Sequence, residues 1–323
     1  TLFGMSPQYS IRIFPGRVSD TTAQLYVQAE VSEAADEYRL SGRINGPHIH
    51  NAHTLPASIP FKDLGPGETV LVATVIPDPC VWTPDCPALY DLSLDLVTTA
   101  GEVVKRIQTK TGISSFGVYR NSFYLNAKRF VPRLIHESFV GTHSFDELRE
   151  ARLGVFANEP SEDMLLESSR LGVPLMVRAT LERLDELAAW PSVFAVLLDL
   201  NNLVSPSPSS NRHLSSNRLA VAKVWRGAPT NTDGATNASD EGTDAWIVSR
   251  KPEDLTESGQ TISALPTAGP IVFATELTET DGLDLKTLRR HCDLLQQQTA
   301  QCARGAAFLL VPSSLEDRVF PDD

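Results

Sequence analysis

Apolar and polar residues alternate in short runs through the first third of the chain. Two clear runs are 23–27 (Ala-Gln-Leu-Tyr-Val) and 70–75 (Val-Leu-Val-Ala-Thr-Val), and further runs lie at 38–40 and 90–97, with clusters of Gly, Pro and Asp between them. A period of two residues is typical of antiparallel strands that bury one face. The spacing of these runs over about 100 residues predicts an immunoglobulin-like β-sandwich.

The pattern changes after Asp146, where apolar residues recur three or four positions apart and alternate with short, continuously apolar runs. Continuous runs are typical of parallel strands that are covered on both faces. Ser144 and Ser161 are predicted to cap two helices, and two more helices are predicted at 180–189 and 285–300. The second part of the chain therefore has an α/β pattern.

Eight strands are predicted in this α/β part, which is the number that closes a TIM-type (β/α)8 barrel. They are expected at 131–135, 155–157, 173–177, 193–198, 219–224, 245–248, 271–275 and 307–311. The barrel is expected to be reduced or irregular, because 205–216 and 227–243 are rich in Ser, Asn, Pro, Asp and Gly and are predicted to be loops. We predict a sandwich domain over 1–120 and a small or degenerate barrel domain over 121–323.

Charge and composition narrow the choice of partner. The chain has 40 acidic and 28 basic side chains and a formal charge of -12, so it is expected to repel nucleic acid and anionic membranes and to suit a neutral partner. No apolar run approaches the roughly 20 residues that span a bilayer. The sequence has no Gly-rich phosphate loop, no G-x-S-x-G and no H-E-x-x-H, so no cofactor is predicted.

The cysteines and a histidine cluster give no metal-binding pattern. Cys80 and Cys86 form one local pair, Cys292 and Cys302 another, and neither has C-x-x-C spacing. A disulfide between Cys80 and Cys86 would close a short loop and indicate an extracytoplasmic location, and two free thiols are the alternative. The histidines His48, His50 and His53 are interpreted as incidental, and no metal site is predicted.

Four stretches carry a resemblance to a known family. They are 81–90 (Val-Trp-Thr-Pro-Asp-Cys-Pro-Ala-Leu-Tyr), 112–128 with Phe-Gly-Val-Tyr-Arg and Phe-Tyr-Leu-Asn-Ala-Lys, 163–174, which ends in Leu-Gly-Val-Pro, and 190–194 (Trp-Pro-Ser-Val-Phe). In that order they resemble the W-x-P-x-x-P-x-L-Y, F-G-x-R with F-x-L-N-G-K, L-G-I-P and H-P-S-V motifs of glycoside hydrolase family 2, the β-galactosidase and β-glucuronidase family. The resemblance implies an immunoglobulin-like domain followed by a TIM barrel.

The resemblance also implies where catalysis would occur. A retaining glycosidase uses two carboxyl groups about 5 Å apart, and in the family these are glutamates that end strands four and seven. The register from 191–193 places Asn201 where the family has the acid glutamate, and Asp199 lies two residues earlier. At strand seven, 269–276 resembles P-I-I-x-x-E with one extra residue, which a β-bulge would absorb. Glu276 is thus the candidate nucleophile and Asp199 the candidate acid.

Other polar residues are expected at the same ends of the strands and are candidates for substrate binding. They are His136, Glu159, Arg178, Asn201, Trp225 and Arg250. A Trp stacks on a sugar face, and arginines bind hydroxyls or carboxylates, although they could equally neutralise neighbouring acidic residues.

Three hypotheses for function follow. The first is a divergent, catalytically impaired relative of the family that has a carbohydrate-binding or scaffold role. The second is an active retaining hydrolase with Glu276 as nucleophile and Asp199 or Glu159 as its partner. The third is a pair of spacer domains within a longer chain.

Overall fold

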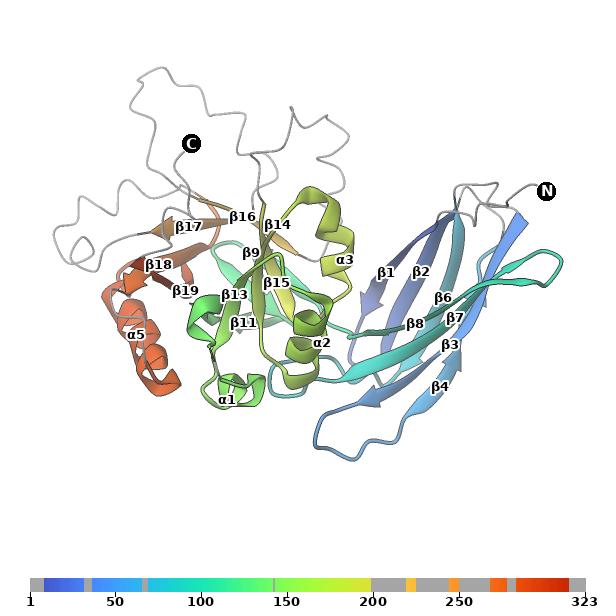
Figure 1. Cartoon of the computed structure of the whole chain (residues 1–323), viewed down its shortest axis with the longest axis horizontal. Coiled ribbons are helices and arrows are strands. Elements are labelled where there is room, and N and C mark those ends of the chain that lie inside the picture. The colour runs from blue at the N-terminus through green and yellow to red at the C-terminus, as the bar shows by residue number, and fades with distance from the viewer. Residues whose placement is uncertain are drawn as a thin grey trace, which may run out of the picture. The chain divides into compact units, whose positions relative to one another are not determined.

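The computed structural model describes residues 9–31, 37–65, 69–141, 143–198, 219–224, 244–249, 268–277 and 283–313 (Figure 1). Contacts divide the chain into two compact units, Thr1–Ser114 with Asp185–Pro191, and Ser115–Leu184 with Ser192–Asp323. The domain boundary at residue 120 stays a prediction. No helix among the described residues is both long and apolar enough to cross a membrane.

The first unit contains two antiparallel sheets of four strands each, in the orders β1-β2-β6-β5 and β4-β3-β7-β8. The strands are β1 (Tyr9–Val18), β2 (Thr22–Val31), β3 (Tyr38–His48), β4 (Ala57–Pro60), β5 (Lys62–Asp63), β6 (Val70–Pro77), β7 (Leu89–Thr98) and β8 (Val103–Thr111). In β2, Ala23, Leu25, Val27 and Ala29 are buried while the residues between them are partly exposed. This alternation buries one face of each sheet against the other, so the predicted β-sandwich is confirmed.

Two of the family-like stretches pack against each other in this unit. A Cβ atom built on Gly112 would lie only 2.4 Å from Cγ of Pro191. The Thr111 hydroxyl donates to the carbonyl of Ala189 at 3.2 Å. Glycine at 112 is therefore required by the close approach of the proline ring, because any side chain would overlap it.

Eight parallel strands of the second unit close a barrel in the order β12 to β19 (Figure 1). They are β12 (Arg133–His136), β13 (Gly154–Asn158), β14 (Leu175–Ala179), β15 (Val193–Leu198), β16 (Ala220–Val224), β17 (Ala245–Ser249), β18 (Ile271–Leu277) and β19 (Gly305–Pro312). Each overlaps one of the eight predicted runs. The predicted α/β barrel is confirmed, while the loops predicted at 205–216 and 227–243 lie outside the described residues.

Helices and 3-10 turns lie between the strands along the second part of the chain. The described ones are α1 (Phe145–Glu150), α2 (Glu162–Leu171), α3 (Leu184–Ala188) and α5 (Leu285–Gln298), with 3-10 turns η2 (Glu137–Phe139) and η3 (Leu181–Arg183). Both predicted caps are confirmed, because the Ser144 and Ser161 hydroxyls accept hydrogen bonds from the backbone N–H of Glu147 and Met164. Glu147 completes a capping box by accepting from the Ser144 backbone N–H.

Buried hydroxyls join α2 to the start of β15. The side-chain oxygen of Ser192 lies 2.9 Å from that of Ser168 and 2.8 Å from that of Ser169. Ser168 is also 3.0 Å from the carbonyl of Leu165, to which it donates. All three serines are almost completely buried, so this network satisfies groups that would otherwise lose their hydrogen bonds to water.

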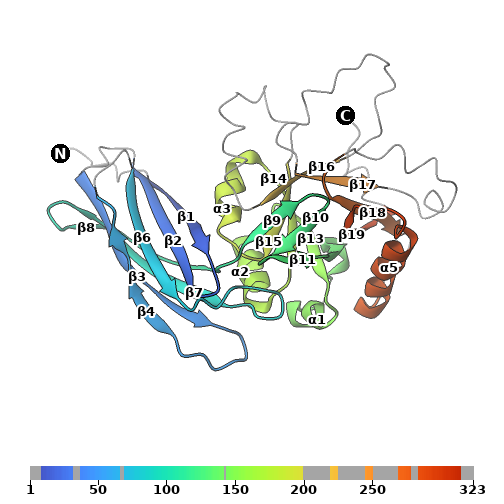
Figure 2. The ribbon, with the colours of Figure 1, turned by 180° about the vertical axis from the view of Figure 1, so that it is seen from behind.

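A small antiparallel sheet that the apolar pattern did not predict comes before the barrel (Figure 2). It consists of β9 (Phe116–Tyr119), β10 (Ser122–Leu125) and β11 (Lys128–Phe130). The rings of Phe116, Phe123 and Phe130 lie 5.6, 5.7 and 5.5 Å from the ring of Phe194, near the start of β15. These aromatic contacts fill the end of the barrel at which the strands begin.

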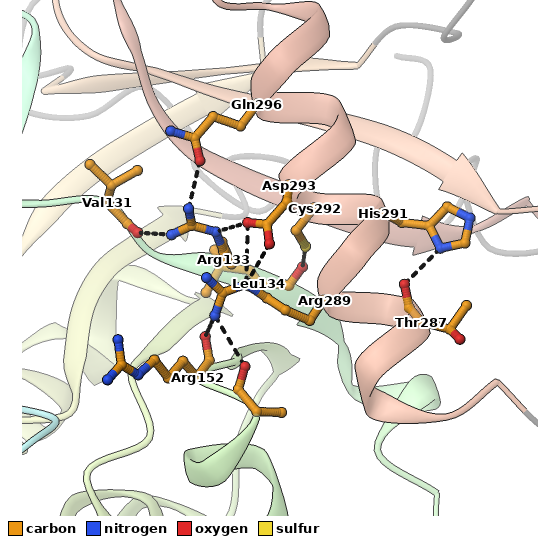
Figure 3. Close-up of polar contacts among 11 residues, drawn as sticks. Val131, Arg133, Leu134, Arg152, Thr287, Arg289, His291, Cys292, Asp293 and Gln296 are labelled. Carbon is orange, nitrogen blue, oxygen red and sulfur yellow. Dashed lines mark hydrogen bonds and ion pairs between the residues drawn. The ribbon is translucent and has the colours of Figure 1, made fainter.

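Ion pairs connect the last described helix to the first strand of the barrel (Figure 3). Asp293 of α5 accepts from Nε of Arg133 at 2.5 Å and from Nε of Arg289 at 3.1 Å. Arg289 also donates to the carbonyls of Ala151 and Arg152, at 3.1 and 3.3 Å, just beyond the end of α1. A cation in this position stabilises the carbonyl groups that a helix leaves unpaired at its C-terminus.

Candidate functional site

Polar side chains lie on the inner face at the C-terminal ends of several barrel strands. Successive side chains of a strand point to opposite faces, and the core cluster inside the barrel includes Leu134, Phe156, Met176 and Ala274. The residues two positions further along the same four strands are His136, Asn158, Arg178 and Glu276. These four are therefore expected to point inward at the end where barrel enzymes place their sites.

His136 is buried and neutral at physiological pH. Burial lowers its pKa to about 4, because an apolar surrounding disfavours the charged imidazolium. Nδ1 accepts a hydrogen bond of 3.1 Å from the backbone N–H of Ser138, so in the neutral ring the proton must be on Nε2. The chain thus fixes the tautomer that carries its proton on Nε2.

Asn158 lies beside this donor. Its Nδ2 donates to Oε1 of Glu137 at 3.2 Å and lies 3.4 Å from Nε2 of His136, a contact between two donors in this tautomer. Among the buried side-chain oxygens and nitrogens of the described residues, Oδ1 of Asn158 and Oγ1 of Thr275 have no hydrogen-bond partner. An unpaired buried acceptor destabilises the fold by about 1–3 kcal/mol, so such atoms often belong to functional sites.

Glu137 is a site residue that the sequence analysis missed. It directly follows β12, and its carboxylate oxygen accepts from Asn158 across the adjacent strand. The signal was present in the sequence as a histidine and a glutamate together at a predicted strand end. The strand was expected to end at residue 135, which placed Glu137 in the following loop.

The carboxylate of Glu159 is held by the turn that follows β14, and its partners differ from those of Asn158. Its Oε1 accepts from the backbone N–H of Thr180 at 3.1 Å, and its Oε2 pairs with Arg183 at 2.8 Å. Its backbone has φ 44, in the left-handed region. Because both oxygens are held by the turn that follows β14, Glu159 supports the shape of this rim.

Glu276 keeps its inward direction without the bulge that was expected before it. The register of β18 against β17 is regular from Ile271 to Ala274. The irregularity is between β18 and β19, where Ile271 is paired with Gly305 and Val272 with Ala307. The bulged residue is therefore Ala306 of β19. The prediction of a bulge within β18 was wrong.

The other candidates lie outside the described residues, namely Asp199, Asn201, Trp225 and Arg250. In the first unit, His48 is paired with Asp91, with 3.3 Å between Nε2 and Oδ2. No group of three or more His, Cys, Asp or Glu side chains in the described ranges is placed to hold a metal ion.

The sequence of the first unit matches known proteins. Residues 10–113 match the family model of Glycosyl hydrolases family 2. A β-galactosidase from Priestia megaterium is 31% identical over 98 residues, which make up 30% of this chain and 9% of that protein. The first unit of the chain is therefore similar to glycoside hydrolases of family 2. The resemblance that the four stretches predict is confirmed.

Solved structures extend the likeness to the whole described fold. The β-glucuronidase of Bifidobacterium dentium, complexed with coumarin-3-O-glucuronide, matches with a TM-score of 0.59 and 12% identity over 94% of this chain. The β-glucuronidase of Ruminococcus gnavus matches with a TM-score of 0.59 and 13% identity over 95% of this chain. The chain covers 59% and 61% of these two proteins. At such identities the likeness establishes the fold that family 2 proteins share, and it assigns no substrate.

Proposed function

We propose that this chain binds a carbohydrate at the C-terminal end of its barrel and cleaves glycosidic bonds slowly or not at all. One observation carries the proposal, namely that two neighbouring residues leave a donor and an acceptor unpaired. They are the Nε2–H of neutral His136, whose 3.4 Å contact is with Nδ2 of Asn158, itself a donor, and Oδ1 of Asn158. A sugar hydroxyl both donates and accepts hydrogen bonds, so a neighbouring donor and acceptor match it without any charge on the ligand.

The carboxylates support binding more than turnover. Retaining hydrolysis needs a proton donor opposite the nucleophile, and the family register places an amide, Asn201, in the donor position. Glu159 is occupied by Thr180 and Arg183, so we leave it out of the catalytic pair. Glu276 and Glu137 then accept hydrogen bonds from sugar hydroxyls in the proposed complex.

Binding should be measured by calorimetry with 4-nitrophenyl β-D-glucuronide and 4-nitrophenyl β-D-galactoside, because the relatives are β-glucuronidases and a β-galactosidase. We expect the His136→Gln variant to bind the better ligand at least about tenfold more weakly, since one good hydrogen bond contributes about 1.4 kcal/mol. His143→Gln is the matched control, because His143 lies before α1 and pairs with Glu147 at 3.9 Å. Absence of binding to both glycosides would favour a scaffold role.

The inward position of Glu276 favours a second candidate, an active retaining hydrolase with this residue as nucleophile and Asp199 as acid. Release of 4-nitrophenol from the same two glycosides distinguishes the candidates. If the second one holds, Glu276→Gln should lower the rate at least about a thousandfold. Glu150→Gln, an exposed change on α1, should leave that rate unaltered.

A further inference from the structure

We propose that Cys80 and Cys86 are a redox-active pair that closes to an intrachain disulfide, independently of any carbohydrate chemistry. Both residues are free, partly buried thiols in this structure, and their sulfur atoms are 3.6 Å apart. A disulfide bond is about 2 Å long, so the two sulfurs must approach each other by about 1.6 Å to form it.

The backbone on both sides of the pair is already held in place. The backbone N–H of Cys80 donates to the Tyr90 hydroxyl at 2.9 Å, and Tyr90 is buried in the sandwich core. Cys86 donates its backbone N–H to the side-chain oxygen of Thr83 at 2.9 Å and accepts at its carbonyl from the N–H of Thr83 at 3.0 Å. Ordering the loop before oxidation raises the effective concentration of one thiol at the other.

The segment between the cysteines is also fixed to the sandwich. Trp82 is 1% exposed, and its backbone N–H donates to the carbonyl of Ile113 at 2.7 Å. A bond between the sulfurs closes the seven-residue loop 80–86 around this tryptophan. The loop is therefore expected to keep the same fold in both redox states, with the oxidised state more resistant to unfolding.

A low-molecular-weight disulfide, such as oxidised glutathione, is the oxidant in this step. In this step Cys86 is taken as the first attacking sulfur and Cys80 as the second, and the balance is the same if their order is reversed. Cys86 loses its proton, forms a mixed disulfide and releases one glutathione thiol. Cys80 then loses its proton, attacks the sulfur of Cys86 and displaces the second glutathione. Two cysteine thiols are oxidised, and one small disulfide is reduced to two thiols.

The test is thiol mapping of the whole chain after equilibration with oxidised and reduced glutathione. N-ethylmaleimide is added, the chain is unfolded in its presence, and trypsin releases residues 63–105, which contain both cysteines of the pair. We expect this peptide to be lighter by two hydrogen atoms and to carry no maleimide. The matched internal control is peptide 291–304, which contains Cys292 and Cys302 and should carry two maleimides.

Two outcomes would overturn the proposal. One is a peptide 63–105 with two maleimides in the oxidising buffer, and the other is glutathione retained on Cys80 or Cys86. Thermal melting of Cys86→Ser gives a second readout. The wild-type midpoint should exceed that of the variant by roughly 3 °C or more in the oxidising buffer only, and equal differences in both buffers would contradict the bond.

Discussion

At the scale of single residues, His136 links the stability of the fold to pH. Its pKa of about 4 in the folded chain is lower than the ordinary value of 6.5, so the unfolded chain binds the proton more readily between these two values. The free energy of unfolding therefore has its full value above pH 6.5 and decreases as the pH falls from 6.5 toward 4. A difference of this size corresponds to roughly 3 kcal/mol of unfolding free energy.

This prediction is checked by denaturant unfolding at several pH values between 4 and 7. The wild-type free energy of unfolding should fall more steeply toward low pH than that of His136→Gln, by up to about 3 kcal/mol over the range. Glu147 and Asp284, whose pKa values are lowered by backbone hydrogen bonds at helix N-termini, contribute equally to both proteins. Parallel curves for the two proteins would show that His136 does not titrate as a buried group.

Single residues of the site could be predicted from the sequence only in part. His136 and Glu276 follow apolar runs, so their place at strand ends was predictable. The role of Asn158 was not, because its importance comes from two neighbours on the adjacent strand and its own residue type is common in turns. Glu159 illustrates the opposite case, since a carboxylate at a strand end was predictable but its contact with Arg183 depends on tertiary structure.

At the scale of elements, buried parallel strands were the most predictable part of the fold. The six residues of β15, Val193–Leu198, are apolar and all buried, so the run and the element have the same bounds. The sheet of β9, β10 and β11 was missed because strands of three or four residues are too short for a clear period. Its turns are recognised only from the backbone, where Asn126 and Ala127 have φ values of 50 and 61.

Ala127 gives a prediction for this turn. Two positive φ values in a two-residue hairpin are typical of a type I′ turn, in which glycine is preferred, and the family motif F-x-L-N-G-K has glycine at this position. Alanine in the left-handed region costs about 1–2 kcal/mol, partly offset because glycine is more flexible in the unfolded chain. We expect Ala127→Gly to raise the free energy of unfolding by roughly 0.5 kcal/mol, as measured by chemical denaturation.

The control for this change is Ala151→Gly. Ala151 has φ −73 at the end of α1, a conformation that alanine adopts without strain, so glycine should lower stability by about 0.5–1 kcal/mol there. Opposite signs at the two positions would establish that the gain at Ala127 comes from its backbone conformation. A loss at both positions would rule that explanation out.

At the scale of the whole molecule, a barrel depends on the closure of its first strand against its last. Here β12 and β19 pair at only three described positions, from Arg133 with Phe308 to Ile135 with Leu310. The sequence predicts eight strands but not what reinforces this seam, because Arg133 and Asp293 are 160 positions apart. The ion pairs of Figure 3 supply that reinforcement by joining α5 to β12.

Replacement of Asp293 by Ala therefore tests the closure of the barrel. It removes the shared acceptor of Arg133 and Arg289, whose side chains are only 22% and 26% exposed. We expect a loss of about 1 kcal/mol in the free energy of unfolding, more than most exposed ion pairs contribute, because two cations that are mostly shielded from water lose the carboxylate that they share. The loss should shrink in 1 M salt, where the Debye length is about 3 Å.

Asp95→Ala is the control for this change, since Asp95 pairs with a single, 68% exposed Arg106 on the sandwich. The denaturation midpoint of this variant should not change measurably. Similar losses for the two variants would mean that the seam is held by its strand pairing and apolar packing alone.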